Sequence, residues 1–249
     1  MMFFSGWHQP NNGPSGCFEF PYCMISVNRL INRKSRFSVQ QWILDSGAFT
    51  RIFSGKGHLS VKQYAKEINR WSQNGVLLAA VSQDYMCESI ILEKTGLDIP
   101  THQNLTIQRY QRLQAELMAL NCKTYLMPVL QGFKPQDYVS HLQQYGSLLR
   151  HGAWVGVGSV CKRNGSPAQI EDVLMAIHLK RPDLRLHGFG LKKTALQSSI
   201  VWDILYSADS MAASYQARRE GRGKANCPKT ALKYAHKIKS PAQLSIFRK

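Results

Sequence analysis

The sequence predicts an α/β fold, a single domain built as a (β/α)8 barrel of the TIM-barrel type with one strand irregular or missing. Three observations predict it. The chain has 249 residues, about the size of a complete barrel of this kind. Apolar, strand-like runs alternate with amphipathic stretches, as they do around a parallel sheet. Several of these runs also stop abruptly at a small or acidic residue, as buried parallel strands do where they meet an active site.

Seven strands are recognisable as apolar runs bounded by polar or glycine-containing segments. They cover residues 24–28, 42–49, 76–83, 124–130, 153–157, 186–189 and 204–207. A complete barrel needs one strand more. A barrel that lacks or disguises a strand fits this pattern better than an open sheet, which stays the alternative.

Four helices are predicted between these strands. One begins at Ser60, and residues 101–120 repeat apolar side chains at helical spacing. Residues 135–149 and 167–180 each begin at a proline, which the first turn of a helix tolerates. No strand signal follows Ala212, so we expect one domain over residues 1–249 that includes a basic C-terminal segment, residues 212–249.

The charge balance predicts a polyanionic partner. The chain carries 32 Lys and Arg against 15 Asp and Glu, a formal net charge of +17. Basic residues gather in segments that suit phosphate contacts, and the candidates are Lys162, Arg163, Lys192, Lys193, Arg218, Arg219, Arg222 and Lys224. A generally basic, solvated surface is the alternative explanation. The tail does not clearly show the basic amphipathic helix that a membrane surface would require.

The compartment follows from what the sequence lacks. No run of about 18 apolar residues is present, and residues 1–16 have no basic start followed by an apolar core. The six cysteines contain no CxxC pair. We therefore expect a cytosolic protein with reduced thiols.

Polar and glycine residues recur at the carboxyl ends of the predicted strands, where a parallel barrel places its functional groups. These residues are Asp45, Asp84, Gln131, Gly156, Gly158, Gly190 and Asp209. Their common position is stronger evidence for a site than any one of them.

Four segments in this set carry a family resemblance. They are Leu44-Asp45-Ser46-Gly47-Ala48-Phe49, Val129-Leu130-Gln131-Gly132, Val155-Gly156-Val157-Gly158-Ser159 and Ser207-Ala208-Asp209-Ser210. In this order they resemble the tRNA-guanine transglycosylase superfamily, and within it the short phage and bacterial enzymes that insert 7-deazaguanines into DNA. The resemblance covers roughly residues 42–214.

The resemblance implies a role for each acidic residue. Asp209 would be the nucleophile that attacks the sugar C1′, and Asp45 the general acid and base that handles the proton of each base. As alternatives, Asp45 could cap the following turn and Asp209 the following helix. Asp203 is a rival nucleophile, but it precedes the apolar run of its strand.

The other residues would bind the base. The resemblance implies that Asp84 and Gln131 read its polar edge, that the backbone of Gly156 and Gly158 adds hydrogen bonds, and that Gly190 shapes the pocket floor. Tyr85, next to Asp84, could sandwich the flat base or simply be part of the core. His187 is expected to be structural.

The sequence departs from the superfamily in two places. The tRNA-acting members have a CxCxxC zinc motif followed by a histidine, whereas here only Cys227 and His236 stand near the end, so we expect no structural zinc. The family's glutamate beyond the glycine-rich strand is also absent, and Lys162 and Arg163 stand in that loop. The choice of incoming base therefore stays open.

These observations favour an enzyme that exchanges guanine in DNA for a free 7-deazaguanine, such as the 7-cyano form, through a covalent aspartyl intermediate. The scheme requires no metal, redox cofactor or nucleoside triphosphate; the deazaguanine is a co-substrate. Three alternatives stay open: action on tRNA, a non-catalytic nucleic-acid-binding subunit, and an N-glycosidase that transfers the sugar to water.

Overall fold

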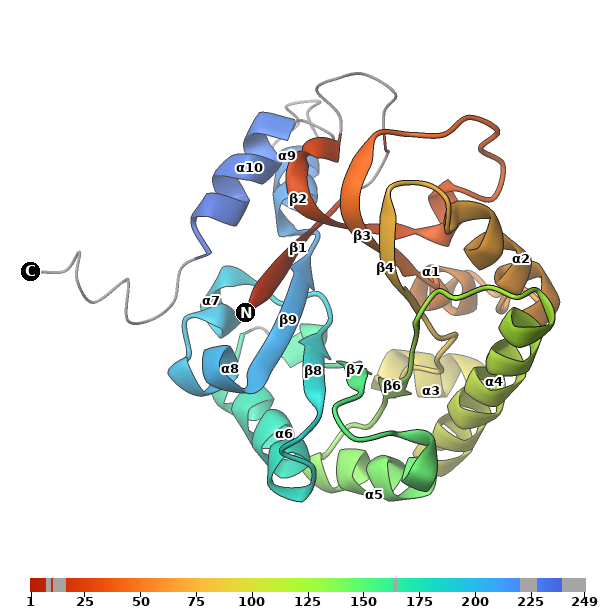
Figure 1. Ribbon diagram of the computed structural model, residues 1–249. Helices are drawn as coiled ribbons and strands as arrows, with labels where there is room; N and C mark the ends of the chain where they lie inside the picture. The colour runs from red at the N-terminus through yellow and green to blue at the C-terminus, as the bar shows by residue number, and fades with distance from the viewer. Residues whose placement is uncertain (8–9, 11–16, 164, 220–227, 239–249) are drawn as a thin grey trace, which may run out of the picture.

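The computed structural model of the chain describes residues 1–7, 10, 17–163, 165–219 and 228–238. All strands are parallel and form one sheet with the order β5-β4-β3-β2-β1-β9-β8-β7-β6. Their bounds are β1 Met2–Gly6, β2 Cys17–Ser26, β3 Val39–Asp45, β4 Val76–Val81, β5 Leu126–Met127, β6 Val129–Leu130, β7 Trp154–Val157, β8 Arg185–Gly188 and β9 Leu205–Ser210. Figure 1 shows them as a ring surrounded by helices.

The ring is a nearly closed barrel with one seam, between β5 and β6. These two short strands are one strand position interrupted at Pro128, whose backbone has no N–H to donate. The Ser82 N–H donates to the Met127 carbonyl on one side, and the Gly156 N–H donates to the Pro128 carbonyl on the other, both at 2.9 Å. The chain itself therefore bridges the seam, and the sheet has eight strand positions. The (β/α)8 prediction is confirmed.

The strand that sequence reasoning lacked is β1, at the N-terminus. It pairs with β2 and β9 and is thus in the middle of the sheet order. Its apolar run is only Met-Phe-Phe, too short to be distinguished from a loop by pattern. The expected strand over residues 42–49 ends earlier, at Asp45, because Gly47 has a φ of +66° and helix α1 (Ala48–Phe53) begins directly after it.

The predicted helices form close to their expected bounds. They are α2 (Val61–Trp71), α4 (Ile99–Ala119), α5 (Pro135–Tyr145) and α6 (Pro167–Lys180). At the start of α2, the Ser60 hydroxyl accepts from the Gln63 N–H at 3.1 Å and the Ser60 N–H donates to the Gln63 side chain, so a capping box fixes this end.

The remaining helices are short. They are α3 (Ser89–Thr95), α7 (Lys193–Leu196), α8 (Ser199–Ile204), α9 (Ala212–Arg219) and α10 (Pro228–His236), with 3-10 turns η1 (Val27–Arg29), η2 (Gly146–Leu148) and η3 (Cys161–Arg163). The basic tail is thus helical over α9 and α10. Helix α10 packs beside β1 and β2, and its Tyr234 hydroxyl accepts from the Lys193 N–H at 3.2 Å (Figure 1).

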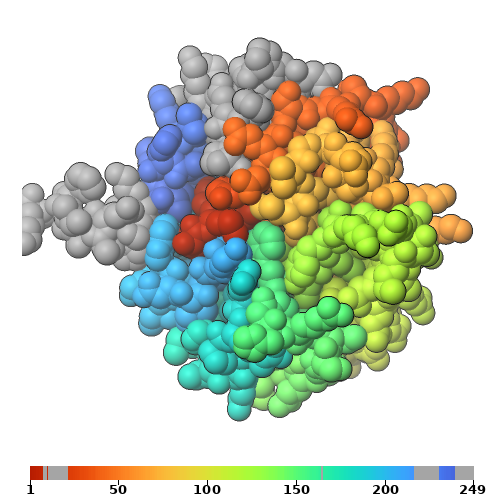
Figure 2. Space-filling view, in the orientation of Figure 1, coloured from red at the N-terminus to blue at the C-terminus, as the bar shows by residue number. Residues whose placement is uncertain are grey.

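Apolar side chains fill both faces of the sheet, which explains why the strands read as continuous apolar runs. On β3, Ile43 points into the barrel, while Trp42 and Leu44 pack against the outer helices. The inner cluster comprises Phe4, Met24, Ile43, Ala79, Val81, Met127 and Val129. Atoms fill the middle of the ring on the face shown in Figure 2, so the barrel is a packed core.

Candidate active site

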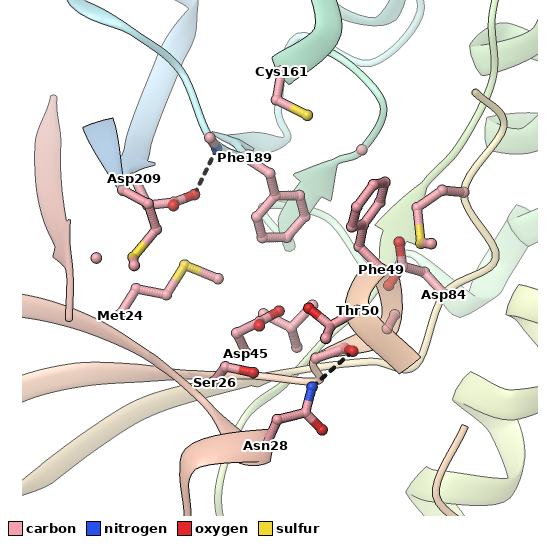
Figure 3. Close-up of a pocket in the computed structure, with 18 of the residues that line it drawn as sticks. Met24, Ser26, Asn28, Asp45, Phe49, Thr50, Asp84, Cys161, Phe189 and Asp209 are labelled. Carbon is pink, nitrogen blue, oxygen red and sulfur yellow. Dashed lines mark hydrogen bonds between the residues drawn. The ribbon is translucent and has the colours of Figure 1, made fainter. Parts of the chain in front are cut away.

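A cavity of about 610 Å³ opens at the carboxyl ends of the strands. Every strand position of the barrel supplies a residue to its wall. In chain order, these residues are Gly6, Ser26, Asp45, Asp84, Gln131, Gly158, Gly190 and Asp209. Figure 3 shows Asp45 and Asp209 entering this space from different walls. The structure therefore brings both predicted catalytic carboxylates to one cavity.

Asp45 is held at the end of β3 by a tight turn. The Asn28 side-chain N–H donates to the Gly47 carbonyl at 3.0 Å, and a Cβ on residue 47 would lie 2.2 Å from the same nitrogen, so only glycine fits. Burial raises the pKa of Asp45 from 3.8 to about 6, although a hydrogen bond with Ser26 opposes the rise, and the charge of Asp209 raises it further. A carboxyl group with such a pKa can give and take a proton near neutral pH.

Asp209 is anchored through one oxygen. Its Oδ1 accepts from the Gly190 N–H at 2.9 Å and lies 3.3 Å from His187 Nε2. Its Oδ2 has no hydrogen-bond partner among the described residues, so this oxygen is available to a ligand. The contact with helix α9 comes from Ser210, whose hydroxyl accepts from the Ala212 N–H at 3.2 Å. A helix cap therefore does not explain Asp209.

The rival nucleophile lies elsewhere. Asp203 is exposed on α8, before β9 begins, and does not line the cavity. Strand β9 extends through Ser210, so Asp209 is its second-last residue and pairs with Phe4 of β1. A strand buried on both sides positions this carboxylate more rigidly than a loop would.

Asp84 and Gln131 meet in the cavity wall. The Gln131 amide nitrogen donates to Asp84, and the Ser159 hydroxyl donates to Gln131 Oε1 at 2.8 Å. Burial raises the pKa of Asp84 from 3.8 to about 7; the Gln131 bond opposes this rise and the charge of Asp45 adds to it. This bond occupies one N–H of the Gln131 amide and one lone pair of Asp84 Oδ2, so a second N–H and further lone pairs are left for a ligand.

Gly158 makes room for the Gln131 side chain. A Cβ at residue 158 would lie 2.1 Å from Gln131 Nε2, and the backbone groups of Gly158 are already bonded to Leu130 and to the Tyr138 hydroxyl. Gly156 does not line the cavity. A Cβ there would lie 2.3 Å from the ring of Phe189, which does line it. Gly190, expected at the pocket floor, also holds Asp209.

Tyr85 lies away from this cavity. It lines a second groove beside α2 and α4, where its ring centroid is 4.7 Å from that of His58 and 6.0 Å from the Arg109 guanidinium carbon. The aromatic ring that lines the cavity on the side of Asp84 is instead Phe49, from α1 (Figure 3). Proximity to Asp84 in sequence did not place Tyr85 in the same space.

Sequence reasoning missed the cavity residue Glu88 and the contact that His187, behind the cavity wall, makes with Asp209. Glu88 is only 6% exposed, lines the cavity and has one carboxylate oxygen without a hydrogen-bond partner. Burial raises its pKa. His187, expected to be structural, contacts Asp209 directly. Only its position in the segment His187-Gly188-Phe189-Gly190, next to the strand-end glycines, could have indicated this.

Cations and exposed aromatic rings lie together near the cavity. The Lys162 ammonium lies 5.0 Å from the ring centroid of Phe49, and the Arg163 guanidinium lies 5.2 Å from that of Phe133. These rings are 38% and 51% exposed. Of the other predicted cations, Lys192 and Lys193 are at the start of α7 and Arg218 and Arg219 end α9, whereas Arg222 and Lys224 lie outside the described residues.

Two features are absent from the described residues. In that part of the chain, no three His, Cys, Asp or Glu side chains gather as metal ligands would. No helix within the same residues has the length and apolar character needed to cross a membrane.

Comparison with known protein families gives a match over nearly the whole chain. The model of the family described as "DpdA: DeoxyPurine in DNA protein A" matches residues 3–246, nearly the whole chain. A search among curated proteins finds no match.

Proposed function

Since the chain belongs to the DpdA family, whose description links it to deoxypurine modification in DNA, we propose that it replaces guanine in DNA with a free 7-deazaguanine base, such as the 7-cyano form. The observation that carries the proposal is the pair of carboxylates, Asp45 and Asp209, that face one cavity. The cavity volume of about 610 Å³ leaves room for a flipped purine nucleoside.

In the first half-reaction, Asp209 Oδ2 attacks C1′ of the target deoxyguanosine. The C1′–Oδ2 bond forms as the C1′–N9 bond breaks, and the electron pair of the broken bond stays on guanine. Protonated Asp45 donates its proton to the departing base. Its raised pKa of about 6 suits this task, because about a tenth of the carboxyl is still protonated at pH 7, far more than at its ordinary pKa of 3.8.

In the second half-reaction, the roles reverse. The Asp45 carboxylate removes the N9 proton of the incoming 7-deazaguanine, N9 attacks C1′ and Oδ2 leaves as a carboxylate. Two inversions give net retention at C1′. The product lacks N7, whose protonation would assist departure of a guanine, so reversal is slow.

Asp84 and Gln131 select the base. The Asp84 carboxylate can accept from the N1–H and the exocyclic amine of a guanine-like ring, and the Gln131 amide can donate to its carbonyl. A base without these groups would leave the remaining donor and acceptor sites of this buried pair without partners, at about 1 to 3 kcal/mol for each orphaned group. Phe49 and Phe189 provide the apolar surfaces that a flat ring requires.

The DNA strand would cross the rim of this cavity. Chemistry at C1′ requires the target nucleotide to leave the stack, at a cost of about a few kcal/mol, unless it is already unpaired. Exposed Phe49 and Phe133 offer ring faces, and Lys162 and Arg163 beside them offer charge to phosphates. These contacts support a nucleic-acid partner independently of the family.

The decisive experiment is exchange and trapping with purified protein. Labelled 7-deazaguanine incorporation into DNA should be lost in Asp209→Asn, and a covalent protein–DNA adduct should be trapped with the wild type but not with this variant. Asp203→Asn is the matched control, because Asp203 is exposed on α8 in the same segment, and it should retain exchange. Wild-type exchange rates in Asp209→Asn would disprove the assignment of Asp209 as the nucleophile.

Parallel assays separate the alternatives. Incorporation into tRNA but not DNA would move the substrate to tRNA. Abasic sites formed without any deazaguanine would indicate an N-glycosidase, and DNA binding without exchange would indicate a binding subunit. Mass spectrometry of nucleosides from DNA of cells expressing the chain identifies the inserted base.

A further inference from the structure

A column of polar side chains runs through the otherwise apolar interior of the barrel and ends at Asp209. It consists of Trp154 on β7, Ser207 and Asp209 on β9, and His187 on β8. His187 and Ser207 are completely buried. Around them lie members of the inner apolar cluster, including Phe4, whose ring centroid is 5.9 Å from that of His187.

The contacts in this column are continuous. Trp154 Nε1 lies 2.8 Å from Ser207 Oγ, and Ser207 Oγ lies 2.9 Å from His187 Nδ1. His187 Nε2 then lies 3.3 Å from Asp209 Oδ1. None of these residues except Asp209 lines the cavity. A ligand in the cavity therefore meets only the last member of the column.

The direction of each hydrogen bond in the column follows from the Trp154 indole, which can only donate. An indole N–H can only donate, so Ser207 Oγ accepts from Trp154. Its own hydroxyl hydrogen then finds its acceptor in His187 Nδ1, the only other hydrogen-bond partner of Ser207 Oγ among the described residues. Nδ1 is thus the unprotonated nitrogen, and the proton of a neutral imidazole is on Nε2, which faces the carboxylate.

From this column we infer that His187 is a positioning residue for Asp209, and that Ser207 and Trp154 fix His187 as the Nε2–H tautomer. The inference rests on the proposed function, in which Asp209 is the nucleophile. His187 and Gly190 both donate to Oδ1 and leave Oδ2 to face the sugar. The opposite tautomer would set a lone pair of Nε2 against a carboxylate oxygen.

The column acts differently on the two half-reactions. Hydrogen bonds to a carboxylate are stronger than those to an uncharged ester carbonyl. The donors at Oδ1 therefore stabilise Asp209 as it leaves the ester, when the C1′–Oδ2 bond breaks and the electron pair returns to the carboxylate. No proton moves along the column, and His187 keeps the Nε2 proton throughout. Resolution of the adduct by the incoming base is the step that the column should accelerate most.

Two variants of the column and one control test the inference. Ser207→Ala removes the donor to Nδ1, and Trp154→Phe removes the indole N–H while it keeps an aromatic ring among the inner aromatics. Tyr125→Phe is the matched control. Its hydroxyl bonds to the backbone of Trp154, at 2.8 Å to the carbonyl and 2.9 Å to the N–H, but is not part of the column.

The first readout is the tautomer of His187, measured by nitrogen-15 NMR of the imidazole in protein without substrate. We expect the Nε2–H tautomer in the wild type and in Tyr125→Phe, and a smaller population of it in Ser207→Ala. A wild-type His187 that carries its proton on Nδ1 would overturn the inference. This measurement is independent of exchange activity, so it stands whether or not Asp209 proves to be the nucleophile.

The second readout is kinetic. We expect Ser207→Ala to resolve preformed adduct roughly 10-fold more slowly, with trapped adduct accumulating and KM for the base unchanged, since it weakens a hydrogen bond to a charged acceptor. Trp154→Phe should act in the same direction, and it serves as the test if Ser207→Ala fails to fold. Resolution rates equal to those of Tyr125→Phe in both variants would overturn the positioning role. Exchange by Asp209→Asn would instead overturn the proposed function.

Discussion

Replacing Asp84 by Asn should stabilise the protein while it abolishes base selection. The pKa of Asp84 rises from 3.8 to about 7 in the cavity wall. The native state therefore keeps this proton up to about pH 7, whereas the unfolded chain releases it near its ordinary pKa. Stability falls as pH rises between these two values, because the native state binds more protons there. The difference of about 3 between the two pKa values corresponds to about 4 kcal/mol.

An asparagine at residue 84 has no charge to bury, and its side-chain oxygen can still accept from Gln131. Asp84→Asn should thus be more stable than the wild type by about 4 kcal/mol at pH 8, and the difference should shrink toward zero near pH 4. Urea unfolding at several pH values between 4 and 8 measures both limits. Exchange should be lost, because the amide places an N–H donor where the carboxylate has its second acceptor oxygen, and that donor would face an N–H of the base.

Asp183→Asn is the control of opposite sign. Arg181 donates to Asp183 at 2.7 and 2.8 Å and holds the pKa of that carboxyl well below its usual range. Its contribution to stability is present above the ordinary pKa and is lost as pH falls, so this variant should be less stable than the wild type at pH 8. An Asp84→Asn protein no more stable than the wild type at pH 8, or equally stabilised at pH 4, would refute the reasoning.

Three further predictions concern the cavity and its rim. Gly158→Ala should displace the Gln131 side chain and weaken base binding, at a cost of about 1 to 3 kcal/mol in stability. Gly165→Ala is the control, because a Cβ there meets open space, and it should change neither base binding nor stability. Titration with the free base measures the binding, and equal binding by the two variants would contradict this prediction. Adduct formation in single turnovers should slow as pH rises through about 6, where Asp45 loses its proton, and adduct resolution should speed up. Asp45→Asn should make both rates independent of pH in this range. Unchanged pH–rate profiles in that variant would exclude the proton-handling role. Lys162→Ala should weaken DNA binding and reduce the salt dependence of log K by about 0.7 to 0.9, as expected for one lost phosphate contact, and an unchanged slope would show that Lys162 does not contact phosphate.

The positions of the two cavity carboxylates, Asp45 and Asp209, could be predicted from sequence. Strands of a parallel sheet are buried on both faces, so their apolar runs are visible, and the residue that ends such a run lies at the edge where active sites form. Asp45 and Asp209 followed from this rule, and the structure places both in the cavity. Helix α6 was equally readable, because a proline in its first turn marks its start.

The tertiary structure decided where the side chains beyond the strand ends point. Tyr85 follows Asp84 immediately, yet its ring packs with His58 and Arg109 outside the cavity, and Glu88 enters it instead. Strand β1 is also recognisable only from its pairing with β2 and β9. Periodicity reports whether a residue is buried, but the direction of a loop side chain depends on partners far away in the chain.

The same difference applies to Asp209, the proposed nucleophile, and to the residues that hold it. An apolar run that ends in an acid is local information, and it indicates from the sequence alone that Asp209 lies at a strand end. Its hydrogen bonds come from His187 and Gly190, 22 and 19 residues away, and the column continues to Trp154 on a third strand. Only the closed barrel brings these strands into register, because pairing between β7, β8 and β9 is set by packing of the whole sheet.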